Sequence, residues 1–413
     1  MSDTNYLIIG NSAAGIGGIQ GIREVDPDGT ITLVASEPYH TYSRPLISYW
    51  LEGRVDQEQM KYRDDDFYEK NGVTTRLGTT VTGIDEGTHM VTLDNGETVS
   101  YDKLLLATGS SPFVPPIEGK ETAQNAFTFT TMEDAQGVKA CLTPESRVVI
   151  LGAGLIGLKA AEALVDQCAG ITIVDLADRV LPSVLDEECA TVMENYLTGL
   201  GMSFKLKTSI TKIGNAEVTL SDGDKLPYDI LILAVGTRPA TGLAQDAGAE
   251  CERGIVTDDT QKTNLMDIYA AGDCTQSHDI SSGTEKNMAI LPNAFMQGET
   301  AGINMAGGEA HFDKGFPVNA MGIKDFYMLT AGSTVGEPIE ITGPNHQIRK
   351  FYISDDELKG YMIMGDCQRG GIYTDLIRKR THLSSTDWKK LLEAPQLSAF
   401  DQEERRAKLA RVH

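Results

Sequence analysis

The hydrophobic pattern repeats one arrangement twice along the chain: an apolar run, a glycine-rich turn and a stretch of small residues at helical spacing. The first copy opens with Tyr6–Ile9 and the second with Arg147–Leu151. A further apolar run follows each helical stretch, at Ile31–Val34 and at Ile171–Val174. Continuous apolar runs are typical of strands buried on both faces, and their alternation with helices favours parallel pairing. The pattern predicts a doubly wound α/β fold.

Three more apolar runs lead into a glycine, which indicates strands that end at a turn. They are Leu104–Gly109, Ile230–Gly236 and Asp267–Gly272, the last followed directly by Asp273. The segment Leu291–Ala294 comes next, and a helix is expected after it because Gln297, Gly298 and the small residues up to Ala306 recur at helical spacing. These elements extend the predicted sheets and add one helix after the last strand.

The pattern of hydrophobic and polar residues changes beyond Lys314. The runs Ile348–Ile353 and Leu358–Met364 flank the polar segment 354–357, a pattern that predicts a β-hairpin. Two helices are expected after it, at about 371–380 and 386–392. The C-terminal part therefore reads as a small α+β domain without a glycine-rich turn.

The second glycine-rich turn has the spacing of a dinucleotide-binding site. Gly152, Gly154 and Gly157 stand between a strand and a helix, and Asp175 ends the next strand. The glycines allow a tight turn, close approach of a pyrophosphate and close helix packing, while the helix N-terminus attracts phosphate. A carboxylate at Asp175 can accept hydrogen bonds from both ribose hydroxyls but would repel a 2′-phosphate. The pattern predicts NAD(H), with NADH preferred over NADPH.

The first glycine-rich turn is irregular. It runs from Gly10 to Gly15 and carries Ser12 where the central glycine normally stands. Serine is small and can donate to a phosphate, so a second dinucleotide site is predicted here. Alignment of the following strands places Ala35 opposite Asp175, and the nearest carboxylate is Glu37, which we take as the adenosine-ribose ligand.

Charge and cysteine usage narrow the function class. The net charge of -23 opposes nucleic-acid binding; it either solubilises the surface or attracts a basic partner. Neither a signal peptide nor an apolar stretch long enough to span a membrane is evident. The six scattered cysteines include no CxxC pair, so neither a metal site nor an iron–sulfur cluster is expected. These features favour a cytoplasmic protein.

The order of these motifs resembles the pyridine-nucleotide-dependent flavoprotein reductases, which have the glutathione-reductase-like fold. The resemblance covers about residues 4–310 and implies FAD at the first glycine turn and NAD(H) at the second. By this resemblance, Asp273 hydrogen-bonds the ribityl chain of FAD. The helix that begins near Asn293 is likewise implied to point its N-terminus at the pyrimidine edge of the flavin.

The segment Tyr42–Leu46 refines the resemblance. Many relatives carry a redox-active cysteine here, but this chain has none before Cys141 and places Pro45 at that position. The sequence instead resembles NADH:rubredoxin reductases and the flavin module of assimilatory nitrite reductases. Arg44 and Pro45 are then implied to lie near the flavin, and no thiol chemistry is expected.

One position departs from these relatives, which usually carry glutamate near the nicotinamide where this chain has Lys159. Glu162 lies one helical turn further along. It either substitutes for that glutamate or is a solvated helix residue.

The resemblance implies an NADH-dependent flavoprotein oxidoreductase that passes electrons through FAD to or from an external iron–sulfur or rubredoxin-type carrier. Alternatives are an NADH oxidase, a quinone or nitrite reductase module, or a flavin-bound redox subunit of a larger complex. We expect an FAD-binding domain made of residues 1–113 and 239–313 and an NAD-binding domain at 114–238, each with a Rossmann-like fold. Residues 314–413 are expected to form a small domain for dimerisation or carrier docking.

Two sets of residues are expected to bind the cofactors, and no side chain is assigned a catalytic role. The FAD set is Gly10, Ser12, Ala13, Ala14, Gly15, Glu37, Arg44, Pro45, Ala107, Thr108, Gly109, Gly272, Asp273, Asn293 and Ala294. The NAD set is Gly152, Gly154, Leu155, Ile156, Gly157, Asp175, Val235 and Gly236.

Overall fold

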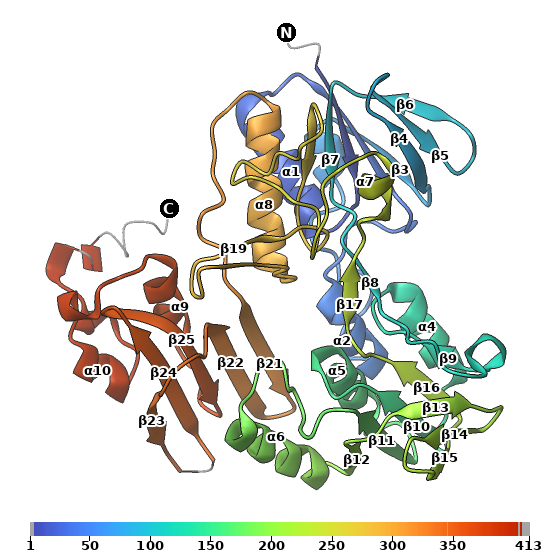
Figure 1. Ribbon diagram of the computed structural model, residues 1–413, viewed down its shortest axis with the longest axis vertical. Coiled ribbons are helices and arrows are strands. Elements are labelled where there is room, and N and C mark those ends of the chain that lie inside the picture. The colour runs from blue at the N-terminus through green and yellow to red at the C-terminus, as the bar shows by residue number, and fades with distance from the viewer. Residues whose placement is uncertain (1–3, 345, 404, 407–413) are drawn as a thin grey trace. The chain divides into compact units, whose positions relative to one another are not determined.

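The computed structural model describes residues 4–344, 346–403 and 405–406, and their contacts form two compact units (Figure 1). The first unit runs to Ser277 and resumes from Leu291 to Phe312. The second unit consists of His278–Ile290 and the chain from Asp313 onward.

The first unit contains two five-stranded parallel sheets that share the order of four strands and differ in the fifth, an edge strand that comes last in sequence in the first sheet and first in the second. One sheet is ordered β18-β7-β1-β2-β3 and the other β9-β16-β10-β11-β12. The strands of the first are β1 (Asn5–Ile9), β2 (Thr30–Ala35), β3 (Val73–Leu77), β7 (Lys103–Leu106) and β18 (Ile268–Ala270). Those of the second are β9 (Ala126–Phe127), β10 (Arg147–Leu151), β11 (Gly170–Asp175), β12 (Met202–Leu206) and β16 (Ile230–Leu233). The α/β fold with two Rossmann-like modules is confirmed.

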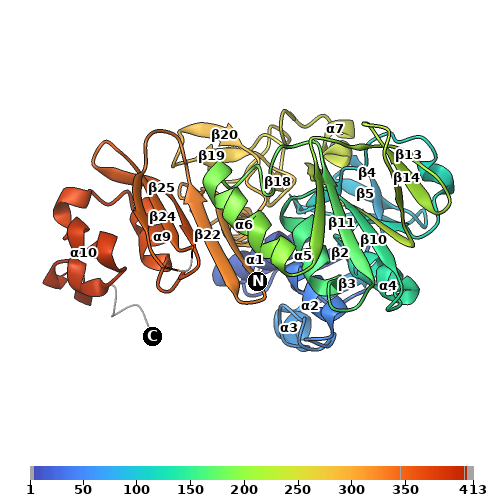
Figure 2. The same cartoon turned by 90° about the horizontal axis from the view of Figure 1, so that it is seen from below.

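Each sheet belongs to a module that also contains a helix after the strand that leads into its glycine turn and a small antiparallel sheet. We name the two modules after the cofactors expected there. The flavin-side module, built on the first sheet, has helix α1 (Ala13–Val25) after β1, and the nucleotide-side module, built on the second, has α5 (Leu155–Leu164) after β10. Figure 2 shows β10 and β11 with α5 against them. Each module also carries a three-stranded antiparallel sheet. The strands are β4 (Val81–Asp85), β5 (Met90–Leu93) and β6 (Thr98–Ser100) in one module, and β13 (Ile210–Ile213), β14 (Glu217–Leu220) and β15 (Lys225–Pro227) in the other. The antiparallel pair of β8 (Ser110–Pro112) and β17 (Thr237–Pro239) forms where the chain crosses between modules.

Helix α8 (Leu291–Met305) packs along α1, as Figure 1 shows. The contact is made through glycines of both helices: a Cβ atom at any of them would come within 2.0 to 2.3 Å of a backbone oxygen of the facing helix. These glycines are Gly17, Gly21, Gly298 and Gly302. Real Cβ atoms do not approach so closely, so the two backbones can lie together only because side chains are missing there.

The second unit is built on a five-stranded antiparallel sheet ordered β21-β22-β25-β24-β23. Its strands are β21 (Val318–Ile323), β22 (Phe326–Gly332), β23 (Ile339–Thr342), β24 (Ile348–Ser354) and β25 (Glu357–Met364), and its helices are α9 (Gly371–Arg378) and α10 (Trp388–Glu393). The predicted hairpin is present as β24 and β25. Phe351, Tyr361 and Tyr373 are fully buried at its centre.

Residues 278–290 pack into the second unit although they precede α8 in the chain. Ile280 belongs to the core of that unit, and its N–H donates to the Gly315 carbonyl at 3.0 Å. Asp279 is completely buried and is satisfied by Lys286 at 2.6 Å and by Ser281 and Ser282. The predicted limits of the domains place this segment with the flavin-side part of the chain; its contacts group it with the C-terminal part.

The packing of α1 on α8 gives a test of stability. In Gly298→Ala, the new Cβ would meet the Ala14 carbonyl oxygen at 2.0 Å. We expect a loss of about 1–3 kcal/mol in the free energy of unfolding, because this backbone contact cannot relax cheaply. Urea denaturation followed by circular dichroism measures it. Gly199→Ala is the control, since that glycine ends a helix with open space around it; equal midpoints for the two variants would contradict the expectation.

Candidate functional site

The first glycine turn is held rigidly between two strands. The Gly10 N–H donates to the Val34 carbonyl at 2.8 Å, and Gly10 adopts φ 118°. A Cβ there would come within 2.0 Å of the Ala107 carbonyl oxygen, and one at Gly15 within 2.1 Å of the Gly10 carbonyl oxygen. Only glycine fits at either position.

The second glycine turn reproduces these contacts one for one. The Gly152 N–H donates to the Val174 carbonyl at 2.8 Å, with φ 117°. A Cβ at Gly152 would meet the Ala234 oxygen at 2.2 Å, and one at Gly157 would meet the Gly152 oxygen at 2.0 Å. Gly154 instead faces open space, with nothing within 4 Å of its virtual Cβ, which leaves room for a phosphate beside the backbone.

Ser12 takes the place of Gly154 without altering the turn. Both are extended, with φ -111° and ψ -164° at Ser12 and φ -83° and ψ -176° at Gly154, and neither helix that follows has a side-chain cap. Neither helix has an acidic residue in its first turn. Other helices of the unit do carry side-chain caps, from Thr131 and Asp186. The uncapped N–H groups at the two glycine turns therefore fit a phosphate group.

The turn after β18 is fixed against α1 and α8. A Cβ at Gly272 would lie 2.9 Å from the Ala14 Cβ and 3.4 Å from the Ala294 Cβ. The Gly272 N–H donates to Gln297 Oε1 at 2.9 Å, and Gln297 is buried. Asn293, also buried, lies in the first turn of α8. The structure thus brings Ala14, Gly272 and Ala294 together, as the FAD assignment requires.

Gln297 is not among the cofactor-binding residues predicted from the sequence, but it contacts the turn that carries them. Its Nε2 donates to Ser277 Oγ at 2.6 Å while its Oε1 accepts from Gly272. It therefore clamps the turn that presents Asp273 onto α8. The available signal was a second amide on this helix, four residues after Asn293 and so on the same helix face.

Asp273 lies at the carboxyl end of the first sheet, directly after Gly272. The Ser110 hydroxyl donates to its Oδ2 at 3.4 Å. Burial raises the pKa of Asp273, and the Ser110 hydrogen bond and the charge of Arg44 offset this only in part. The site therefore holds a poorly solvated carboxylate suited to accepting a ligand hydroxyl.

Glu37 and Arg44, predicted separately, form an ion pair. The Tyr42 hydroxyl donates to Glu37 Oε2 at 2.6 Å and accepts from the Met132 N–H at 3.2 Å. Arg44 Nη1 donates to the Thr130 carbonyl at 3.1 Å. Burial lowers the pKa of Arg44, but Tyr42 and Glu37 outweigh burial and the pKa lies above its usual value. This cluster joins the flavin-side module to the nucleotide-side module.

Asp175 is oriented over the second glycine turn by two backbone groups. Its Oδ2 accepts from the Ala153 N–H at 2.6 Å and its Oδ1 from the Ala177 N–H at 2.8 Å. The nearby Arg179 is paired with Asp178 at 3.0 Å. Arg179 is therefore engaged elsewhere, and the carboxylate of Asp175 sets the local charge where a 2′-phosphate would lie.

Residues at the ends of two strands form hydrogen bonds where the chain passes from one module to the other. Thr108 Oγ1 donates to the Ala240 carbonyl at 2.8 Å, and the Ala240 N–H donates to the Gly109 carbonyl at 2.9 Å. The Phe113 N–H donates to the Gly236 carbonyl at 2.9 Å. The remaining predicted residues line the turns: Ala13 is buried, Leu155, Ile156 and Val235 are half-buried, and Pro45 is exposed.

Glu162 is buried, with a side chain 2% exposed, and pairs with Lys159. The reading of Glu162 as a solvated helix residue is therefore wrong. Helical spacing alone shows that the two charges can meet, whereas the burial depends on helix α2 (Ile47–Glu52), which covers this face of α5.

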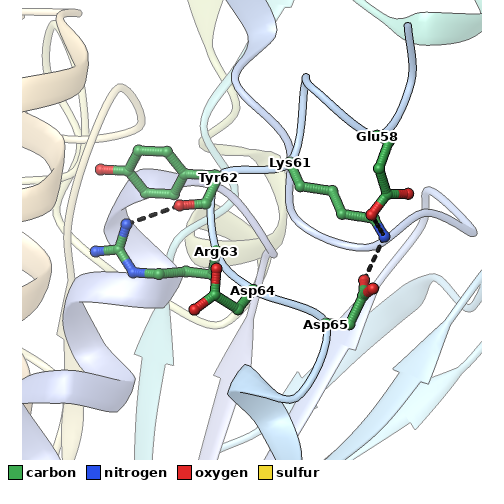
Figure 3. A pocket seen from close by; sticks show the side chains of 6 residues that line it. All are labelled: Glu58, Lys61, Tyr62, Arg63, Asp64 and Asp65. Carbon is green, nitrogen blue, oxygen red and sulfur yellow. Dashed lines mark hydrogen bonds and ion pairs between the residues drawn. The ribbon is translucent and has the colours of Figure 1, made fainter.

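A polar hollow of ≈ 350 Å³ lies elsewhere in the flavin-side module (Figure 3). It is lined by Glu58, Lys61, Tyr62, Arg63, Asp64 and Asp65. The Lys61 ammonium pairs there with Glu58 and Asp65, and Arg63 Nη1 donates to the Tyr62 carbonyl at 2.9 Å. Its lining includes none of the predicted cofactor residues.

The comparisons with known proteins agree with this geometry. The profile of the pyridine nucleotide-disulphide oxidoreductase family matches residues 4–298. The chain belongs to this family. Its members bind FAD and NAD(H), so the chain is a FAD-dependent NAD(P)H oxidoreductase, as the resemblance implied.

Several family members resemble the chain over most of its length. It is 31% identical to the NADH-dependent phenylglyoxylate dehydrogenase subunit epsilon of Aromatoleum evansii, over 92% of this chain and 93% of the relative. It is 30% identical to rubredoxin-NAD(+) reductase of Pseudomonas putida, over 73% of this chain and 80% of the relative. A chain of the covalent putidaredoxin reductase–putidaredoxin complex aligns with a TM-score of 0.86 at 25% identity, covering 92% and 94%.

All six cysteines are described by the structure and none of them forms a disulfide, although the family takes its name from disulphide chemistry. Cys274, next to Asp273, is buried, and its thiol contacts the Leu106 and Ala271 carbonyls. Burial raises the pKa of Cys274, which keeps the thiol protonated and unreactive. Among the described helices, none is both long and apolar enough to cross a membrane.

The preference for NADH over NADPH should depend on the carboxylate of Asp175. We expect Asp175→Ser to weaken NADH binding by about tenfold and to narrow the gap to NADPH, because a charged hydrogen-bond acceptor worth about 1.5–3 kcal/mol is lost. Anaerobic stopped-flow reduction of the flavin by each nucleotide measures this. Asp222→Ser, an exposed carboxylate of the same module, is the control. A wild-type preference for NADPH would contradict the assignment.

Flavin retention should depend on Asp273. We expect Asp273→Ala to lower the FAD content after gel filtration, since a hydrogen bond worth about 1–3 kcal/mol is removed. Heat release and chromatography of the cofactor quantify it. Asp94→Ala removes an exposed carboxylate from the same module and should keep the full flavin content; equal content in both variants would show that Asp273 does not hold FAD.

Proposed function

We propose that this protein exchanges electrons between NADH and an external iron–sulfur or rubredoxin-type carrier. Bound FAD would take up a hydride from NADH and release the two electrons singly. The observation that carries the proposal is the segment Tyr42–Leu46, which presents Arg44 and Pro45 and no thiol beside the site assigned to the flavin. The relatives named for rubredoxin and putidaredoxin partners support it.

The proposal gives each cluster a role. Backbone N–H groups at Gly10–Gly15 would hold the FAD pyrophosphate, and Glu37 would bind the adenosine ribose. Asp273 would bind the ribityl chain, and the N-terminus of α8 at Asn293 would face the flavin ring. The same logic assigns the turn Gly152–Gly157 and Asp175 to NADH.

The charges of the chain are divided unequally, which bears on the carrier. The first unit has 43 Asp and Glu against 20 Lys and Arg, whereas the second unit has 16 of each. An acidic carrier would meet a repulsive field over the first unit and none of this size over the second. The division favours the second unit as the docking side for such a carrier.

The test is anaerobic reduction of purified carriers by the FAD-loaded protein and NADH. A rubredoxin and a [2Fe–2S] ferredoxin are assayed side by side, and the rate of oxygen consumption is measured separately in air. We expect at least one of the two carriers to be reduced at least about tenfold faster than oxygen is consumed. The comparison matters because faster oxygen consumption would identify an NADH oxidase instead. A control without NADH measures the background.

A second function is favoured by the near full-length match to a protein named as the epsilon subunit of an NADH-dependent dehydrogenase. The chain would then be the flavin subunit of a larger complex and would pass electrons to NAD⁺. Affinity purification from the native host distinguishes the two: a stable assembly well above 44.7 kDa that reduces NAD⁺ with its own substrate supports the subunit. We propose the cytoplasm as the location, in line with six cysteines that form no disulfide.

A further inference from the structure

Helix α2 belongs to the flavin-side chain segment but packs on the nucleotide-side module. It directly follows Arg44–Leu46 and contacts α5 and α4 (Met132–Cys141). Gln167 Nε2, beyond the end of α5, donates to the Leu51 carbonyl at 3.2 Å. The helix therefore lies where the two modules are joined.

Two aromatic residues of α2 each receive a lysine from the other module. Lys159 Nζ lies 4.4 Å from the centre of the Tyr49 ring, and Lys139 Nζ lies 4.2 Å from that of Trp50. The two contacts differ in environment: Lys139 is exposed, whereas the side chain of Lys159 is only 19% exposed. A cation–π contact is stronger where water is excluded.

Lys159 is anchored from behind by the buried carboxylate of Glu162. A carboxylate in such surroundings is costly unless it is paired, so the ion pair fixes the position of the ammonium group. The three side chains form a chain of contacts from inside α5, through its surface, to α2. Each link constrains the next.

This chain of contacts connects two segments that adjoin the predicted cofactor residues. Lys159 is two residues beyond Gly157 of the NAD turn, while Tyr49 follows Arg44, whose charge acts on Asp273. Hydride transfer needs the reacting atoms about 3–3.5 Å apart, and a shift of about 1 Å can cost about a hundredfold in rate. A contact that fixes α5 against α2 therefore fixes the distance on which the reaction depends.

We propose that Glu162, Lys159 and Tyr49 are positioning residues for hydride transfer between NADH and FAD. Glu162 holds Lys159, Lys159 holds the Tyr49 ring, and the nucleotide-side helix is thereby kept at its working distance from the flavin-side segment. The inference rests on the proposed NADH-to-FAD reaction but not on the identity of the carrier.

Stopped-flow reduction of the FAD-loaded protein by NADH tests the proposal. We expect Lys159→Met and Tyr49→Leu to lower the limiting rate of flavin reduction about tenfold, with less than about a threefold change in the Kd for NADH. Tyr49→Phe should stay within about twofold of wild type, because the ring that faces the ammonium is kept. A purely structural role would not separate the limiting rate from the Kd.

A static measurement gives a second readout. Adding NAD⁺ to the dithionite-reduced protein should produce a long-wavelength absorption band from stacked nicotinamide and flavin rings, weakened in Lys159→Met and Tyr49→Leu. Lys139→Met, the exposed contact on the same helix, is the matched control and should leave the rate and band unchanged. If Lys159→Met loses FAD, Tyr49→Leu carries the test, since its exchange removes no buried charge.

The outcomes are separable. Limiting rates within twofold of wild type in Tyr49→Leu and in flavin-loaded Lys159→Met would overturn the proposal. A wild-type protein that NADH reduces readily but that reduces no carrier would refute the carrier function and leave the positioning role intact.

Discussion

The contact between α1 and α8 is the constraint on which the flavin-side site depends. Glycines on both helices let the two backbones touch, so the first turn of α1, the first turn of α8 and the Gly272 turn share one small region. Gln297 then ties that turn to α8 by hydrogen bonds at both ends of its amide. A single methyl group in the helix contact would move the residues that present Asp273.

The two modules build their glycine turns in the same way. In both, a glycine turn opens an uncapped helix free of first-turn acids, while α4 and α6 (Glu187–Gly199) use side-chain caps. An open N-terminus is tolerable only where a ligand or water satisfies its N–H groups. In this respect α1 and α5 differ from α4 and α6.

Much of this organisation could be predicted from sequence because it is local. Apolar runs, glycine spacing and the carboxylate after β11 specify strands, turns and Asp175 with few assumptions. The ion pair of Glu37 with Arg44, the clamp by Gln297 and the burial of Glu162 could not be predicted in this way. Each depends on a partner placed by tertiary packing, such as Thr130 for Arg44 or α2 for Glu162. Helix α8 also begins earlier than expected, at Leu291, because its Pro292 suits a first helical turn.

The first sheet is interrupted in the sequence by the whole second sheet, and this has a consequence for biosynthesis. Strand β18 and helix α8 are translated only after residues 126–233 have supplied the strands of the nucleotide-side module. A chain emerging from the ribosome can thus complete the second sheet while the first still lacks an edge strand and the glycine face of α1 is uncovered. Flavin capture must then be a late event, possible only once about three-quarters of the protein has been synthesised.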